Sequence, residues 1–112
     1  DVLQELERIC ERRGLRRTVE LTMSASAAPS DVRWQQRWEK AVDALGVPLY
    51  RMPSGAGHDA MKLHEVMPQA MLFVRGQNAG ISHNPLESTT SDDMQLAVDA
   101  FSKLLDQLAT EF

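Results

Sequence analysis

Residues 47–74 read VPLYRMPSGAGHDAMKLHEVMPQAMLFV, and this stretch decides which fold the sequence predicts. It holds a short extended run, a glycine-containing turn, a short helical run that ends before Pro68, and the apolar run AMLFV at 70–74. A run that is apolar on both faces is typical of a buried parallel strand. Strand, helix and strand in this order form a βαβ unit, which implies a parallel sheet covered on both faces.

The segments on either side of this unit are helical in pattern. A helix is predicted to begin after Ser30 or Asp31 and to end at Gly46, and the last helix follows a polar cap at 90–93. The apolar stripes of these two helices are formed by Trp34, Trp38, Ala41, Val42 and Leu45, and by Met94, Ala97, Val98, Phe101, Leu104, Leu105 and Leu108. We therefore predict an α/β fold, a partial parallel sheet with flanking helices.

The first thirty residues form a different unit. Apolar residues recur at helical spacing up to Gly14, and residues 19–25 alternate as in a half-exposed strand of an antiparallel sheet. The stretch SASAAPS at 24–30 is small, nearly uncharged and contains a proline, as linkers do. We expect residues 1–28 to be a helix, a strand and a linker, and residues 29–112 to form the second domain.

Composition excludes several classes of function. The 43% hydrophobic share is that of a globular protein, and the net charge of −4 argues against a nucleic-acid partner. No apolar run approaches the roughly 18 residues of a membrane helix. The single cysteine, Cys10, rules out an intrachain disulfide and fits the cytoplasm. The chain opens inside a helical pattern without Met, so we expect it to be a piece of a longer protein.

Two polar loops follow the two predicted strands of the βαβ unit. The first, SGAGHDAM at 54–61, has glycines that would let backbone N–H groups approach an anion or oxyanion near a helix start. It is equally an ordinary strand-to-helix turn in which Asp59 acts as the cap. The second, GISHNPLE at 80–87, places a histidine on a segment stiffened by proline. Ligands bind beyond the carboxyl ends of parallel strands, so we expect the two loops to face one another.

His83 has two interpretations on these residues alone. A stiff loop that bears an imidazole, with Glu87 within reach to orient it, is what a metal site requires. A lone loop histidine is more often a surface residue, and no second ligand stands at a zinc-finger or H-E-x-x-H spacing. His64, beside Lys62 and Glu65 on the short helix, is interpreted as solvated surface.

The order SGAGHDAM, AMLFVRG, GISHNPLE resembles the C-terminal part of the M20-type metal-dependent amidohydrolases. The likeness is to the group of allantoate amidohydrolases and N-carbamoyl-L-amino-acid hydrolases. It is specific from about residue 47 to 87 and looser elsewhere. The family often has consecutive glycines before ISH, whereas this chain keeps only Gly80 after Asn78 and Ala79.

The resemblance implies a role for each matching residue. His83 would be a metal ligand, His58 would lie close to the substrate as a catalytic residue, and Asp59, Asn84 and Glu87 would support them. The residues implied to line the substrate pocket are Ser54, Gly55, Ala56 and Gly57. Residues 1–28 would end a lid or dimerisation domain, which implies a homodimer.

The implied activity is hydrolysis of a ureido or carbamoyl C–N bond, with allantoate as the first candidate substrate and N-carbamoyl amino acids or ureidoglycolate as alternatives. Two divalent metals, zinc or manganese, would activate water. The resemblance places the other ligands, the base and a carboxylate-binding arginine upstream, so we expect this chain alone to be inactive and to hold no metal. A competing hypothesis is a non-catalytic interaction module that uses the face formed by Trp34 and Trp38.

Overall fold

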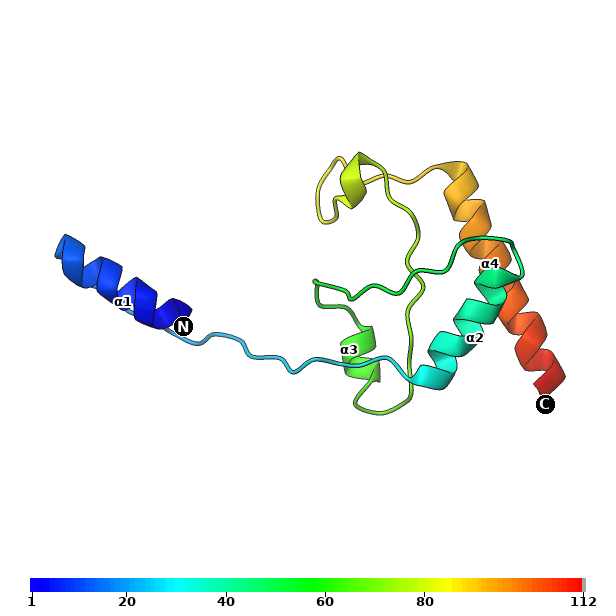
Figure 1. Cartoon of the computed structure of the whole chain (residues 1–112), viewed down its shortest axis with the longest axis horizontal. Helices are drawn as coiled ribbons and strands as arrows, with labels where there is room; N and C mark the ends of the chain where they lie inside the picture. Colours follow the sequence, from blue (N-terminus) through cyan, green and yellow to red (C-terminus); the bar gives the residue numbers. More distant parts are fainter. Residues whose placement is uncertain (112) are drawn as a thin grey trace.

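The computed structural model describes residues 1–111, and every regular element in that part of the chain is helical. In chain order the helices are α1 (Val2–Arg13), α2 (Val32–Asp43), α3 (Ala60–Leu63), a 3-10 turn η1 (Asn78–Gly80) and α4 (Ser91–Glu111). Figure 1 shows α1 apart from the others, joined to them by a long extended segment. Two long segments without regular structure connect α2, α3 and α4.

The predicted parallel sheet is wrong for residues 1–111. Segments 47–51 and 70–74 are extended, but neither has a backbone hydrogen bond to the other or to any further segment. The backbone groups of an extended run are satisfied by a neighbouring strand, and no strand lies alongside either one. None of the side chains of segment 70–74 is buried: residues 70–72 are partly exposed, and Phe73 and Val74 are 45% and 47% exposed. The apolar composition of segment 70–74 favours burial, but the described chain covers this segment only in part.

The predicted strand at 19–25 is wrong for the same reason. The segment is extended, has no paired neighbour, and exposes Leu21 at 83% and Met23 at 79%. The helix before it is confirmed. Asp1 accepts a hydrogen bond from the Leu3 N–H at 3.1 Å, and Gly14 ends α1 in the left-handed conformation with φ 63°.

The start signals of the other long helices are confirmed as well. The Asp31 carboxylate accepts from the N–H groups of Arg33 at 3.0 Å and Trp34 at 3.2 Å. At the start of α4, the Thr90 hydroxyl accepts from the Asp93 N–H at 3.0 Å and donates to the Asp93 carboxylate at 2.7 Å. These contacts satisfy N–H groups that have no partner within the helix.

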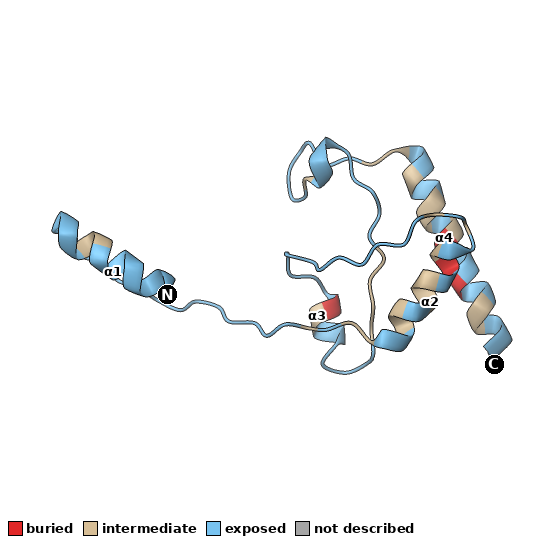
Figure 2. Cartoon of the chain, in the orientation of Figure 1, coloured by how far each residue is buried: buried red, intermediate tan, exposed pale blue. Residues whose placement is uncertain are grey.

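The core lies where α2 crosses α4, which is the one pair of helices packed together among the described residues. Ala41 is fully buried there, and Ala100 and Leu104 are 3% and 4% exposed. Figure 2 shows these buried residues gathered at the crossing. The rings of Trp38 and Phe101 meet beside them, with centroids 5.8 Å apart and planes at 45°. Small residues at the crossing let the two backbones approach closely.

The described chain is extended overall. Its principal extents are 65 × 33 × 21 Å and its radius of gyration is 20.1 Å, against about 13 Å for a compact domain of this length. Within residues 1–111, no helix combines the length and apolar character needed to cross a membrane.

Candidate functional site

His83 lies in a loop, residues 75–89, whose two ends are joined by hydrogen bonds. The Gln77 N–H donates to the Ser88 carbonyl at 2.8 Å, and the Ser88 hydroxyl donates back to the Gln77 side chain at 2.9 Å. The Thr89 hydroxyl donates to the Arg75 carbonyl at 2.7 Å. The loop is therefore a closed unit with its own internal bonding, seen between the extended segment and α4 in Figure 1.

The η1 turn folds the first half of this loop back on itself. Asn78, Ala79 and Gly80 all have positive φ, at 50°, 59° and 71°. The Asn78 amide donates to the Leu86 carbonyl at 2.7 Å across the loop. A Cβ on Gly76 would lie 3.3 Å from the Cα of Gly80, so the backbone passes itself closely there.

The backbone of His83 is in the left-handed conformation, with φ 56°. For a residue with a Cβ this conformation costs about 1 kcal/mol, so something must hold it. Its N–H donates to Oε2 of Glu87 at 2.9 Å. The imidazole is exposed and takes part in no hydrogen bond or ion pair with residues 1–111. Both ring nitrogens are therefore available to a ligand.

Asn84 and Glu87 contact the backbone of the loop and not the imidazole. The Asn84 side-chain oxygen accepts from the Leu86 N–H at 3.0 Å, and its carbonyl accepts from the Glu87 N–H at 2.9 Å. These bonds close a tight turn through Pro85. The sequence suggested that Glu87 orients the imidazole of His83. In the structure, the Glu87 carboxylate instead accepts a hydrogen bond from the backbone N–H of His83.

The loop 54–59 has a different construction. The Ser54 hydroxyl donates to the Ala56 carbonyl at 2.8 Å. Neither Gly55 nor Gly57 has a positive φ, so the conformation does not require glycine at either position. Asp59 precedes α3, but its side chain makes no capping hydrogen bond there. All the residues implied to line a substrate pocket, 54–57, are exposed.

The side chain of His58, and not that of Asp59 as expected, accepts a backbone hydrogen bond at the start of α3. Its Nδ1 accepts from the Ala60 N–H at 3.2 Å, at the start of α3. A ring nitrogen that accepts a hydrogen bond carries no proton, so the ring proton is on Nε2. His58 can therefore present an N–H donor on its far side. No motif in the sequence predicted this hydrogen bond between Ala60 and His58.

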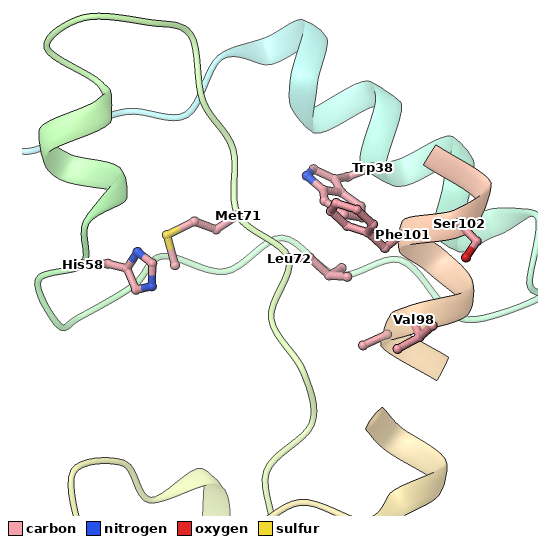
Figure 3. A pocket seen from close by; sticks show the side chains of 8 residues that line it. Trp38, His58, Met71, Leu72, Val98, Phe101 and Ser102 are labelled. Carbon is pink, nitrogen blue, oxygen red and sulfur yellow. The ribbon is translucent and has the colours of Figure 1, made fainter. Parts of the chain in front are cut away.

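His58 borders an open hollow of about 530 Å³, shown in Figure 3. The other residues around it are Trp38, Met71, Leu72, Ala97, Val98, Phe101 and Ser102. In the figure the imidazole faces Met71, while Trp38 and Phe101 meet at the other end. The hollow is mainly apolar, so the His58 ring is one of its few polar groups.

The structure does not bring His58 and His83 together. In Figure 1 both loops lie on the side of the chain away from α4, yet no hydrogen bond or ion pair joins them within residues 1–111. His83 is absent from the residues around the hollow. The sheet edge that was to align the two loops is also absent, so the expectation that they face one another has no support from the fold.

The described residues do not form a metal site by themselves. No group of three His, Cys, Asp or Glu side chains that could hold a metal lies within residues 1–111. A catalytic zinc needs about three protein ligands. The exposed, uncommitted imidazole of His83 fits the role of one ligand, because a nitrogen donor on a closed loop is what such a site takes from each segment.

One ion pair near the first loop was not predicted. Arg51 donates from Nε to Glu39 at 2.5 Å and from its terminal amino group at 3.0 Å, which ties segment 47–51 to α2. This bidentate contact lowers the pKa of the Glu39 carboxyl, and it raises that of Arg51. The two residues are 12 positions apart in the sequence, and they do not lie on one helix or one strand. The spacing rules for helices and strands therefore could not have paired them.

A sequence profile of the peptidase family M20/M25/M40 matches residues 9–107. The chain belongs to this family. The resemblance to M20-type amidohydrolases predicted from the two loop motifs is confirmed. M20 proteins are metal-dependent, and residues 1–111 contain no complete metal site.

The M20 relatives include enzymes with two named substrates. The chain is 34% identical to an N-carbamoyl-L-amino acid amidohydrolase of Geobacillus stearothermophilus, over 92% of this chain and 25% of that protein. It is 32% identical to an allantoate amidohydrolase of Bacillus subtilis, over 97% of this chain and 26% of that protein. An allantoate amidohydrolase of Escherichia coli is 31% identical to it, over 97% of this chain and 27% of that protein.

The chain spans about a quarter of the length of the curated relatives it matches. No solved structure matches it. The M20 match begins inside α1 and ends inside α4, so it includes both loops.

Proposed function

We propose that this chain is the C-terminal part of a binuclear-metal amidohydrolase that cleaves a ureido or carbamoyl C–N bond. The observation that supports it most is the family match over residues 9–107, together with relatives named for allantoate and for N-carbamoyl amino acids. These two compounds share the group –NH–CO–NH₂. Allantoate is the first candidate substrate, with N-carbamoyl-L-amino acids and ureidoglycolate as the alternatives.

His83 serves as one metal ligand in this proposal. Its imidazole is uncommitted, and the loop that bears it is closed by hydrogen bonds at its neck, so the ligand stands on a defined backbone. The remaining ligands come from parts of the protein outside this chain. Two zinc or manganese ions, when bound, would polarise the ureido carbonyl and lower the pKa of a bound water.

His58 and the loop 54–57 form one wall of the substrate pocket. The Nε2–H of His58 is directed to hydrogen-bond an oxygen of the substrate, because Nδ1 is already occupied by the Ala60 N–H. Backbone N–H groups of residues 54–57 line the same wall, and Asp59 supports it. The mainly apolar hollow beside His58 offers nonpolar contact area on that side.

We propose the same division of the chain that the sequence suggested. Residues 1–28 end a lid or dimerisation domain, and residues 29–112 belong to the catalytic domain of a cytoplasmic homodimer. In support, α1 packs against no other helix of the described chain, and segment 15–29 is extended and largely exposed.

The test is a substrate panel assayed with the full-length protein, reconstituted separately with zinc and manganese. We expect hydrolysis of ureido compounds, with the highest kcat/KM for allantoate, and no activity from residues 1–112 alone. A higher kcat/KM for an N-carbamoyl-L-amino acid would keep the reaction and change the substrate. Failure to hydrolyse any of the three compounds in either metal form would contradict the proposal.

A further inference from the structure

We propose that Glu87 is a positioning residue, which aims the His83 side chain by holding the main chain of His83 in the left-handed conformation. The contact that carries this is the hydrogen bond from the His83 N–H to Oε2 of Glu87 at 2.9 Å. The part of the inference that concerns metal binding rests on the proposed role of His83 as a ligand.

The loop is built so that Glu87 reaches back to His83. Asn84 closes the turn between them twice, through its side chain to the Leu86 N–H and through its carbonyl to the Glu87 N–H. Pro85 fixes its own φ and offers no competing N–H. The turn thus brings the carboxylate back to the N–H of His83.

Glu87 has no other evident use. None of the ion pairs found within residues 1–111 involves its carboxylate, and the nearby Arg75 pairs with Asp93 instead, at 3.5 Å. A hydrogen bond from a backbone N–H to a carboxylate is stronger than one to a neutral acceptor. A solvated glutamate would gain nothing from folding back over the turn, so its position is best explained by the bond to His83.

The backbone of His83 decides where its imidazole points. No hydrogen bond or ion pair from the described residues fixes the ring itself. If the N–H were released, residue 83 would relax from φ 56° toward the favoured region near −65°, because the left-handed region is costly for a side chain with a Cβ. That change swings the Cα–Cβ bond and carries the imidazole away from its position.

The experiment uses the full-length protein and four variants, of which His83→Ala serves to interpret one outcome. Glu87→Ala removes the acceptor, and Glu87→Gln keeps a neutral acceptor oxygen of the same length. The matched control is Glu65→Ala, which removes another exposed glutamate whose contact is with Lys62. The first measurement is hydrogen–deuterium exchange of peptides that span residue 83. The second is the apparent Kd for zinc, from competition with a chelator, and melting temperatures check the fold.

The inference predicts that Glu87→Ala speeds exchange at His83 and weakens zinc binding by about tenfold or more. Glu87→Gln should restore most of both, and Glu65→Ala should change neither. If Glu87 only stabilised the fold, Glu87→Ala would lower the melting temperature and Glu87→Gln would not restore it. That result would contradict the inference. Unchanged exchange at His83 in Glu87→Ala would overturn the inference.

Faster exchange with unchanged zinc affinity would also overturn it, and His83→Ala then locates the failure. If His83→Ala loses zinc, His83 is a ligand and Glu87 does not position it. If His83→Ala retains zinc, the ligand assignment itself is at fault, and with it the site part of the proposed function.

Discussion

Ala79 is held in a backbone conformation that suits glycine. Its φ is 59°, between Asn78 at 50° and Gly80 at 71°. Asparagine tolerates this region and glycine adopts it without strain. In alanine, the Cβ comes too close to the following carbonyl oxygen. The resemblance to M20-type sequences implies consecutive glycines here, and glycine adopts the observed φ without strain.

We predict that Ala79→Gly stabilises the protein by about 0.5–1 kcal/mol, because relief of the strained φ outweighs the added freedom of the unfolded chain. Chemical denaturation would measure it. The control is Ala109→Gly in the exposed last turn of α4, where glycine should destabilise by up to about 1 kcal/mol. Destabilisation by both changes would mean that Ala79 is not strained.

At the scale of elements, three of the four buried side chains of the described chain lie on α2 and α4, the two helices that cross. Leu104 is 4% exposed, while its neighbour Leu105 is 51% exposed. We predict that Leu104→Ala lowers the free energy of unfolding by about 2–5 kcal/mol and that Leu105→Ala costs less than about 1 kcal/mol. Thermal or urea unfolding of the two variants measures the difference. Equal losses would show that α4 is rotated from the observed packing.

The pairing of Glu39 with Arg51 predicts a pH dependence at the same scale. The pKa of Glu39 is lowered, chiefly by its hydrogen bond from Arg51, from an ordinary value of 4.5. Its stabilising contribution is therefore present above pH 4.5 and is lost as the pH falls through the lowered pKa. Because Arg51 is exposed and Glu39 is partly exposed, the effect should be small and should shrink as salt is added.

Glu39→Gln provides the measurement. Unfolding of the variant and of the parent should differ at pH 6 and converge under acid, and the difference at pH 6 should fall in high salt. Asp106→Ala, which removes an exposed carboxylate of α4, serves as the control and should not alter the pH profile. A gap between Glu39→Gln and the parent that persists in acid would contradict the ion-pair explanation.

The sequence predicted the long helices better than any other feature, because the signals that start and end a helix lie next to it in the sequence. The N-caps Asp1, Asp31 and Thr90 and the glycines after α1 and α2 act within one turn of the helix they bound, so the signal is complete in the sequence. The strands failed because pairing is not local. Segment 70–74 has the composition of a buried strand, but burial needs a partner, and residues 1–111 provide none.

The assignment of the site residues stays a prediction, and only their local contacts can be compared with what the sequence suggested. The resemblance to M20-type sequences singled out His58 and His83, and both are exposed on loops with a ring nitrogen that takes part in no hydrogen bond within residues 1–111. The side-chain contacts were not predictable. Glu87 binds a backbone N–H, and His58 caps α3 where Asp59 was expected, because both bonds depend on φ and ψ values that the sequence does not state.

At the scale of the whole molecule, the described chain exposes far more surface than a closed domain. Its accessible surface is 9475 Å², against about 6,200 Å² for a folded monomer of this mass. Much of the excess is apolar, including Tyr50 at 85% and Val66 at 77%. An apolar surface of this extent is typical of interaction area. The chain also spans only about a quarter of its M20 relatives.

The account as a whole depends on His83 as the metal ligand that this chain contributes. Metal analysis of the full-length protein, purified as His83→Ala and as the control His64→Ala, tests this directly. His64 is an exposed histidine at the end of α3 and has no assigned role. We expect His64→Ala to keep the zinc or manganese content of the parent. His83→Ala should keep the fold and lose most of its metal, whereas full metal content in folded His83→Ala would contradict the account.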